Sequence, residues 1–352
     1  MLINYRRLAW MIVGLAFFSG RSSAQTCVTP PSGMIAWWTL DETSGIIAND
    51  SVGTEPAAYF GTPGPVQVPG EVAGALQFNG STDFLSAPNS PLWQFGSNDF
   101  TVELWANFAA PPGGSLGDYG DVFIGDDDGP GSRNKWFFAV SGGLLHFTVY
   151  NTADPPPNYY LAQAPFAPVL GQWYHLAVTK EGTNYTIYVK GQEVSSEVST
   201  QPIGNPTASL TIGQAENFFM NGLLDEISIY NRALSPSELQ AIVAAGSAGK
   251  CKLPNASAIS PSSGGNSGAV TVTVTGAEFT PATTVSLQMT GEPSLEGTNT
   301  YASSDGTSLI HQGVPPALPG RQQEFDIFGS PSKKLQEVSR QAHIKENLDG
   351  RV

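Results

Sequence analysis

The chain has 352 residues, 40% of them hydrophobic, with 39 glycines and 27 prolines. This length is enough for one sizeable core and a smaller second module, and the many turn-forming residues favour an all-β chain. Sixteen lysines and arginines stand against 30 aspartates and glutamates, so the formal net charge is -14. Because phosphate contacts need basic side chains, this balance argues against nucleic acid or an anionic membrane as a partner and leaves neutral sugars, cations and basic surfaces open.

The first 24 residues have the pattern of a signal peptide. Two arginines precede an apolar run over residues 8–18, and small residues at 22–24 fit a signal peptidase site, so we expect cleavage after Ala24. The apolar run is too short for a good membrane span. We therefore expect a secreted protein, extracellular or on the cell surface, with no membrane insertion after cleavage.

The chain has two cysteines, Cys27 and Cys251, which flank the region of strongest strand patterning. Export would permit a disulfide between them. Closing so long a loop stabilises a fold by about 5 kcal/mol in the chain-entropy model. If the two cysteines pair, the first and last strands of the enclosed domain lie side by side.

From Gly33 to about Gly249, short alternating segments are separated by Gly, Pro and Asn, which is typical of a β-sandwich. In "DFTVELWANF" every second residue is apolar, and this period of two predicts a strand with one buried face. The residues expected on that face are Phe100, Val102, Leu104, Ala106 and Phe108. In "NYTIYVKGQEV", Tyr185, Ile187 and Val189 likewise share a face before a turn at Lys190-Gly191.

One helix is predicted after the last of these strands. Ser235 is a good N-cap, Pro236 takes the first helical position, Glu238 completes a capping box, and Gly246 ends the helix. We expect its apolar stripe to close one end of the sandwich.

Five segments resemble a known family when they are taken in order. They are "GMIAWWTLDETSG", "GALQFNGSTDFLSAP", "DFTVELWANF", "GQWYHLAVTKEGTNYTIYVKGQEV" and "LTIGQAENFFMNGLLDEISIYNRALSPSEL", which together cover about residues 33 to 246. This order resembles the laminin G-like, concanavalin A-like jelly roll of bacterial secreted proteins. The resemblance implies two antiparallel sheets packed face to face over residues 25–252, and a role in binding rather than chemistry.

The composition and the strand pattern of the sequence change after Lys252. Residues 253–310 look like the first half of an immunoglobulin-like module of the IPT/TIG type, and the strand patterning fades after about Ser308. Residues 311–352 form an atypical tail that holds many of the chain's basic residues. Two interpretations of the tail stay open, an amphipathic helix or an end translated out of the ancestral frame, and in either case we expect poor order.

Signals for catalysis are weak. The Glu-x-Asp-x-x-Glu string of laminarinase-type hydrolases is not found, and Asp225 and Glu226 are adjacent, so in a regular strand they point to opposite faces. "GGSLG", residues 113–117, follows two prolines and opens no helix. His146 and His175 have no Cys or His partner at ligand spacing. We therefore predict no catalytic residue.

Asp225 is the first candidate calcium ligand. By strand parity its carboxylate shares a face with Leu223 and Ile227 and points towards the sandwich interior or its edge, where it needs a cation or several hydrogen-bond donors. Two partners stay open: a structural calcium ion, or backbone N–H groups and hydroxyls from the N-terminal strand around Asp41. Glu226, on the other face, is expected to be solvated.

A second calcium candidate is the hairpin "GDDDGPGSRN", which contains Asp126, Asp127 and Asp128. Adjacent carboxylates repel one another unless a cation intervenes, and oxygen ligands suit calcium. The loop resembles the calcium-carrying hairpin of pentraxins, whose further ligands come from a second loop. That loop reads "GQAENFFMNG" here, with Glu216 and Asn217 as substitutes for the expected ligands. A solvated acidic turn is the other interpretation.

Aromatic residues in or beside these loops are candidates for stacking on a sugar. They are Trp136, Tyr159, Tyr160, Phe218 and Phe219. The Phe218-Phe219 pair is the best of them, because two adjacent rings cannot both face inward from a strand.

These observations predict a secreted, non-enzymatic recognition or adhesion protein that binds carbohydrate or an extracellular protein surface, with calcium as the candidate cofactor. The alternatives are a polysaccharide-active hydrolase or lyase of the same fold, and a purely structural cell-surface spacer.

Overall fold

The computed structural model of the protein describes residues 26–113, 120–129, 134–150 and 159–252. Beyond residue 252 it describes the segments 255–260, 263–264, 270–277, 286–287, 295–296, 298–303, 308–314 and 323–324. The predicted signal peptide, and the predicted tail apart from residues 311–314 and 323–324, lie outside the described residues.

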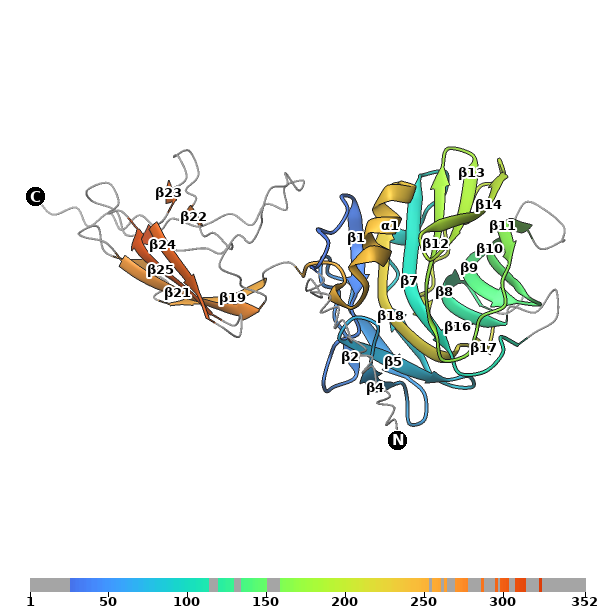
Figure 1. The fold of residues 1–352 in the computed structure, drawn as a ribbon, viewed down its shortest axis with the longest axis horizontal. Helices are drawn as coiled ribbons and strands as arrows, with labels where there is room; N and C mark the ends of the chain where they lie inside the picture. Colours follow the sequence, from blue (N-terminus) through green and yellow to red (C-terminus); the bar gives the residue numbers. More distant parts are fainter. Residues whose placement is uncertain are drawn as a thin grey trace, which may run out of the picture.

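Two antiparallel sheets pack face to face (Figure 1), so the predicted all-β sandwich is confirmed. The first, which we call the helix-side sheet, has the order β14-β13-β12-β7-β18-β5-β4, and β1 also pairs with β18. Its strands are β1 (Met34–Trp38), β4 (Val66–Pro69), β5 (Gly74–Asn79), β7 (Phe100–Phe108), β12 (Trp173–Glu181), β13 (Asn184–Val189), β14 (Gln192–Val198) and β18 (Asn221–Tyr230).

The second sheet, which we call the ribbon-side sheet, has the order β11-β10-β9-β8-β15-β6-β3-β2. Its strands are β2 (Ile47–Ala48), β3 (Ala57–Phe60), β6 (Phe84–Ala87), β8 (Asp121–Asp127), β9 (Lys135–Ser141), β10 (Leu144–Tyr150), β11 (Tyr159–Pro165) and β15 (Leu210–Ile212). Two short 3-10 helices, Pro91–Trp93 and Gly246–Ala248, lie in the connections.

The space between the sheets holds a continuous apolar core. The alternate residues of β7 predicted to share a face all lie in it: Phe100, Val102, Leu104, Ala106 and Phe108. Tyr185 and Ile187 of β13 join the same core, and Val189 packs against it. The predicted turn is also present, because Lys190 and Gly191 both have positive φ angles, 51° and 71°. The period-two patterning therefore identified the core faces of both strands.

The outer face of β7 is buried as well, which the sequence did not lead us to expect. Thr101, Glu103 and Trp105 alternate with the core residues, yet each is at most 5% exposed. The prediction of a single buried face is wrong because further segments of the chain cover the outside of the helix-side sheet.

Helix α1 (Pro236–Ala245) is one of these covering segments. The predicted capping box is present: the Ser235 hydroxyl accepts the Glu238 N–H, and the Glu238 carboxylate accepts the Ser235 N–H. The buried residues Leu239 and Ile242 pack with Tyr230 on the outer face of the helix-side sheet (Figure 1). The helix thus covers a sheet face rather than closing an end of the sandwich, which corrects our expectation.

A two-stranded ribbon covers part of the other outer face. It consists of β16 (Gln214–Ala215) and β17 (Phe218–Phe219). Ala215 and Phe218 pack against Val122, Phe137 and Ala139 of the ribbon-side sheet. Residues 216 and 217 form the turn that joins the two strands.

The two ends of the sandwich domain meet, as the cysteines predicted. Cys27 and Cys251 form a disulfide with their Cα atoms 4.9 Å apart. The Cys251 N–H donates to the Val28 carbonyl at 2.8 Å, and the Val28 N–H donates to the Gly249 carbonyl at 2.9 Å. β1 and β18, the first and last strands, pair antiparallel.

Beyond Lys252 a four-stranded antiparallel sheet has the order β19-β21-β25-β24. Its strands are β19 (Asn255–Ser260), β21 (Val270–Ala277), β24 (Thr298–Ala302) and β25 (Ser308–Val314), and two short pairs are formed by β20 (Ser263–Gly264) with β26 (Gln323–Glu324) and by β22 (Ser286–Leu287) with β23 (Leu295–Glu296). Strand β25 crosses the expected boundary at residue 310, so strand structure does not fade after Ser308. The immunoglobulin-like assignment stays a prediction.

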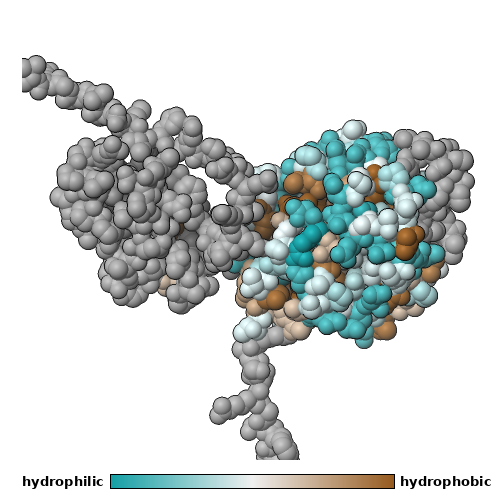
Figure 2. All heavy atoms as spheres, turned by 90° about the horizontal axis from the view of Figure 1, so that it is seen from above, coloured by the Kyte–Doolittle hydropathy of each residue, from teal (hydrophilic) through white to brown (hydrophobic). Residues whose placement is uncertain are grey.

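The surface of the sandwich is mixed in character. Figure 2 shows one face on which hydrophilic residues predominate and apolar patches are small and separated. Within the described part of the chain, no helix combines the length and the apolar character needed to cross a membrane.

Candidate functional site

A β-bulge in β18 explains the unusual Asp225-Glu226 pair. The register of β18 against β7 shifts between Asp225 and Ser228, and Glu226 has a φ of 55°. The extra residue breaks the strict alternation of faces. Both side chains are consequently buried, Asp225 at 0% and Glu226 at 1% exposure. Our expectation of a solvated Glu226 is therefore wrong, because strand parity does not hold across a bulge.

Asp225 receives a backbone hydrogen bond, as one of the two interpretations required. The donor is the Val72 N–H at 2.9 Å, in the turn between β4 and β5, rather than a group of the strand around Asp41. Asp41 holds the same turn, since its Oδ1 accepts the Gly74 N–H at 2.5 Å. Asp225 Oδ1 is buried and has no hydrogen-bond partner among the described residues. Burial and the nearby Glu226 raise the pKa of Asp225 well above its usual range.

Glu226 belongs to a buried ionic network. Its Oε2 accepts the Trp37 indole N–H at 3.1 Å and lies 3.2 Å from Lys250 Nζ. Lys250 Nζ also donates to Glu103 Oε1 at 2.8 Å, and His175 Nε2 lies 2.9 Å from Glu103 Oε2. His175 is therefore a buried partner of a carboxylate, and its ring stacks edge-on against Trp105.

The pKa values of the two glutamates in this network shift in opposite directions. Burial by itself would raise the pKa of Glu103, but Lys250 and His175 outweigh burial and lower it to about 2. Burial raises the pKa of Glu226 to about 7, against the pull of Lys250. Sequence reasoning missed this network, although a lysine immediately before a disulfide cysteine was a usable signal.

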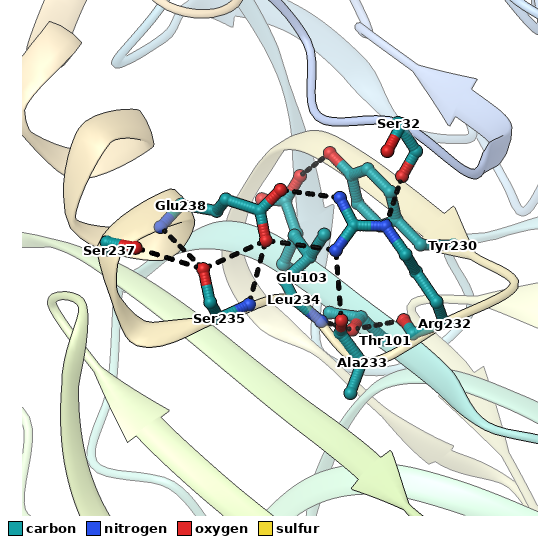
Figure 3. Close-up of polar contacts among 10 residues, drawn as sticks. All are labelled: Ser32, Thr101, Glu103, Tyr230, Arg232, Ala233, Leu234, Ser235, Ser237 and Glu238. Carbon is teal, nitrogen blue, oxygen red and sulfur yellow. Dashed lines mark hydrogen bonds and ion pairs between the residues drawn. The ribbon is translucent and has the colours of Figure 1, made fainter.

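The segment that follows β18 is anchored by polar contacts (Figure 3). Arg232 donates through Nη1 and Nη2 to the Glu238 carboxylate and through Nε to the Ser32 carbonyl. Thr101 Oγ1 donates to the Arg232 carbonyl and accepts the Leu234 N–H, both at 2.8 Å. These bonds fix the start of α1 on the sheet. The Glu238 carboxylate therefore has a structural role.

The acidic hairpin between β8 and β9 is held by protein donors. Asp128 Oδ1 accepts the N–H groups of Thr207 and Ala208, and its Oδ2 accepts the Asn134 amide at 2.8 Å. These contacts lower the pKa of Asp128 against the opposing effect of burial. Asp128 therefore ties the hairpin to the loop that precedes β15.

Lys135 supplies a positive charge within the same hairpin. Its Nζ lies 3.3 Å from Asp127 Oδ1 and forms an ion pair with Glu216 of the ribbon turn. Glu216 and Asn217 have positive φ angles of 52° and 64°, and Asn217 is exposed. The structure thus brings Asp127 and Glu216 together, as the calcium hypothesis required, around an ammonium group of the chain itself.

Asp126 lies on the core-facing side of β8. It is 0% exposed, and it pairs in register with Trp136 and Leu210, both core residues. Neither of its carboxylate oxygens has a hydrogen-bond partner in the described part of the chain. Burial, reinforced by Asp128 and Asp127, raises its pKa to about 7.

Three phenylalanines form a row, two from the ribbon-side sheet and one from the ribbon. Phe60 and Phe84 stack with their ring centroids 5.0 Å apart, and Phe84 meets Phe219 at 6.5 Å. Phe60 is 46% exposed, and the other two are half-buried. Phe218 instead packs against the ribbon-side sheet. Phe60 and Phe84 were missed in the sequence because each looks like an ordinary strand residue.

The other aromatic candidates lie elsewhere. Trp136 is completely buried in the core, so its ring offers no face to a ligand. Tyr159 and Tyr160 lie in β11, but the prediction about their side chains falls outside the described residues. His146 is buried between Ser141 and Thr148, and burial lowers its pKa to about 4. Most of the "GGSLG" segment also lies outside the described residues.

A polar loop adjoins the phenylalanine row. The Gly80 N–H donates to the Met220 carbonyl at 2.9 Å, next to Phe219. Ser81 and Thr82 are exposed, and Asn79 Oδ1 accepts their N–H groups. Their hydroxyls also bond within the loop, that of Ser81 to Asn79 and that of Thr82 to Asn79 and Asp83. The row and this loop together place stacking surface beside hydroxyl groups. Within the described residues, no group of three or more His, Cys, Asp or Glu side chains is arranged to hold a metal ion.

Residues 79–240 match a laminin G family described as the concanavalin A-like lectin/glucanases superfamily. This part of the chain is therefore a laminin G-like, concanavalin A-like domain. The superfamily name covers both lectins and glucanases, so the match does not separate binding from hydrolysis. A comparison with curated proteins found no significant match.

Several solved structures resemble the chain at low identity. Domain 4 of an extracellular arabinanase from Geobacillus stearothermophilus, in complex with arabinotriose, is 19% identical with a TM-score of 0.44, over 59% of this chain and 96% of that domain. A Trypanosoma rangeli sialidase is 17% identical with a TM-score of 0.44, over 62% of this chain and 36% of the sialidase. The binding domain of paraclostridial mosquitocidal protein 1 is 15% identical with a TM-score of 0.44, over 60% of this chain and 52% of that chain.

Proposed function

Because residues 79–240 form a laminin G-like, concanavalin A-like domain, we propose that the protein is a secreted, non-catalytic recognition module that binds a neutral carbohydrate. The observation that carries the proposal is the row of Phe60, Phe84 and Phe219 beside the exposed polar residues Ser81 and Thr82. Aromatic faces flanked by hydrogen-bonding groups suit a pyranose ring, which has one apolar face and hydroxyls at its edge.

Charge and redox chemistry support the same proposal. A net charge of -14 disfavours sulfated or phosphorylated ligands, so a neutral glycan fits the protein better than an anionic one. The Cys27–Cys251 disulfide fits an oxidising compartment outside the cytosol.

A hydrolase is the less favoured function. Asp225 and Glu226, the adjacent carboxylates that stood out in the sequence, are both buried and engaged with protein donors. A substrate cannot reach them without opening the fold. Incubation with polysaccharide mixtures should therefore release no reducing ends, and release by the parent that is lost in Glu226→Gln would replace the binding proposal with a hydrolase.

The binding proposal is tested on a neutral glycan array followed by calorimetry on the hits. Phe60→Ala should raise Kd by about three- to tenfold, the effect of one lost aromatic contact. Val198→Ala is the matched control, because Val198 is 75% exposed at the edge strand of the other sheet. An array with no neutral glycan bound would contradict the proposal, and binding to extracellular proteins alone would replace the carbohydrate by a protein surface.

Calcium remains part of the proposal at Asp225. Asp225 Oδ1 is buried and has no hydrogen-bond partner among the described residues, while Asp225 Oδ2 and the Gly74 carbonyl both approach Gly70 so closely that a side chain there would clash with them. Carboxylate and carbonyl oxygens suit a hard cation.

The calcium proposal is tested by thermal melting. Calcium should raise the melting temperature of the parent by mass action and leave that of Asp225→Asn unchanged. Identical melting curves of the parent in EDTA and in calcium would contradict a site at Asp225.

A further inference from the structure

The side chain of Lys135 is enclosed by three oxygen atoms, two from its own hairpin and one from the ribbon turn. Its Nζ lies 3.3 Å from Asp127 Oδ1 and 3.4 Å from the Gly129 carbonyl, and it forms an ion pair with Glu216. The residue is 2% exposed. An ammonium group has three N–H donors, so these three oxygens satisfy it completely.

Two aromatic rings complete the surroundings of this ammonium group. Nζ lies 5.7 Å from the centre of the Tyr150 ring and 6.0 Å from that of Phe137. Rings at this distance attract a cation through their negative faces. The carboxylates that face the group are Asp127 and Glu216, with Asp128 acting at longer range.

Glu216 needs such a partner for a second reason. It occupies the first position of a tight ribbon turn with φ at 52°, a conformation that glutamate adopts rarely and that Asn or Gly would adopt easily. The ion pair with Lys135 fixes this strained residue from the neighbouring hairpin. The ribbon strand β17, which carries Phe219, follows directly after the turn.

We propose that Lys135 is a tethered cation: its ammonium group takes the place of a divalent ion between the acidic hairpin and the ribbon, and so positions Phe219 for ligand binding. The consequence for binding rests on the proposed function, whereas the cation role does not. Because the charge is covalently part of the chain, the ribbon keeps its place at any calcium concentration. Removing the lysine leaves an acidic oxygen site that a free calcium ion can fill.

The test compares Lys135→Met with the parent by thermal melting in EDTA and in millimolar calcium. Losing one partner of a buried pair should lower the melting temperature by roughly 10 °C, and calcium should restore at least about half of that loss by binding the vacated site. Each measurement is repeated in the Asp225→Asn background, which removes any calcium response of the Asp225 site. Equilibrium dialysis should find one more calcium ion per chain in Lys135→Met than in the parent.

Two controls separate a cation site from general destabilisation. Lys180 is buried too, but it meets one carboxylate, the half-exposed Asp99, at 3.6 Å, so Lys180→Met should lose stability with no recovery in calcium. If Lys135→Met does not fold in EDTA, the combined variant Lys135→Met, Asp127→Asn, Glu216→Gln removes all three charges. This variant should fold, and calcium should leave its melting temperature unchanged.

The proposal is overturned if Lys135→Met melts like the parent, or if its loss of stability is unaffected by calcium. With a glycan in hand, Lys135→Met should bind about tenfold more weakly in EDTA, and calcium should bring Kd back near the parental value. Binding that falls and does not recover, while the melting temperature does, would contradict the positioning of Phe219. If the parent binds no glycan, the proposed function fails, and the melting and dialysis results still decide the role of Lys135.

Discussion

Asp126 carries a buried carboxyl group whose proton affinity differs between the folded and unfolded chain. Its pKa is about 7 in the fold, raised by burial and by the neighbouring aspartates, against about 3.9 for an unperturbed aspartate. Between these two values the unfolded chain has released the proton while the folded chain retains it. Folding stability therefore falls as pH rises through this window, by up to about 4 kcal/mol.

Replacing Asp126 by asparagine should remove this pH dependence. Between pH 5 and pH 8 the free energy of unfolding of the parent should fall by about 3 kcal/mol relative to that of Asp126→Asn, measured by urea unfolding at both pH values. Asp128→Asn is the control, because Asp128 is exposed and accepts several hydrogen bonds, so its loss should stabilise the protein at neither pH. Parallel pH profiles for the parent and Asp126→Asn would show that Asp126 is ionised throughout.

Lys250 compensates the charge of two buried carboxylates. It is 2% exposed and pairs with two buried glutamates, Glu103 and Glu226. Lys250→Met leaves both carboxylates without their cation, and we expect a loss of about 3–5 kcal/mol in the free energy of unfolding. Lys190→Met is a suitable comparison, because Lys190 lies in a surface turn. A change below about 1 kcal/mol in Lys250→Met would mean that solvent reaches the network.

At the scale of the element, helix α1 depends on its first turn. The helix has ten residues, a length that is marginal in isolation, so capping and packing must stabilise it. Ser235 accepts the Glu238 N–H, and the Arg232 pair holds the Glu238 carboxylate that completes the box. Glu238 therefore takes part both in the helix cap and in the ion pair with Arg232 that holds the helix start on the sheet.

The contribution of the cap can be measured with Ser235→Ala. Losing the hydroxyl acceptor should lower the free energy of unfolding by about 1 kcal/mol, measured in urea. Ser237→Ala, two residues further on, should have a smaller effect, since its hydroxyl contacts Ser235 but accepts no backbone N–H in the contacts described. Equal losses from the two variants would indicate that the serine hydroxyl network, rather than the cap, stabilises the helix start.

At the scale of the whole molecule, the disulfide joins the first and last segments of the sandwich. It closes a loop with a sequence separation of 224 residues, and it lies next to the buried Lys250. Closing a loop of this length restricts the unfolded chain by about 5 kcal/mol in the chain-entropy model. The covalent bond also holds the segment that delivers Lys250 to the two glutamates.

Reduction should therefore destabilise the protein markedly. We expect a lower melting temperature in dithiothreitol, with the loss limited to about 5 kcal/mol unless the Lys250 network opens as well. The double variant Cys27→Ser, Cys251→Ser should have the melting temperature of the reduced parent, and dithiothreitol should not change it. Titration of two free thiols in the oxidised parent would rule the bridge out.

Much of the fold could be predicted because its signals are local. The alternation in β7 and β13, the turn at Lys190 and the capping box at Ser235 each depend on residues a few positions apart, where backbone geometry leaves few choices. The two cysteines added one long-range constraint, and the order of five segments indicated the sandwich. These features were correct because propensity, periodicity and capping agreed with one another.

The candidate site was less predictable, since its partners come from distant segments. Nothing near Glu216 in the sequence points to Lys135, and nothing near Phe219 points to Phe60. The bulge at Glu226 likewise escaped a parity argument, because a single extra residue reverses every face beyond it.

The sequence by itself determined that the chain between its two cysteines is an antiparallel sandwich with one capped helix and joined ends, because those features follow from spacing along the chain. Tertiary structure decided where α1 packs, which carboxylates are buried and which cation meets the acidic hairpin. The physical reason is that burial and charge pairing depend on what covers a residue. For Glu226, Asp126 and Lys135, the covering segments are brought into place by the packing of the two sheets.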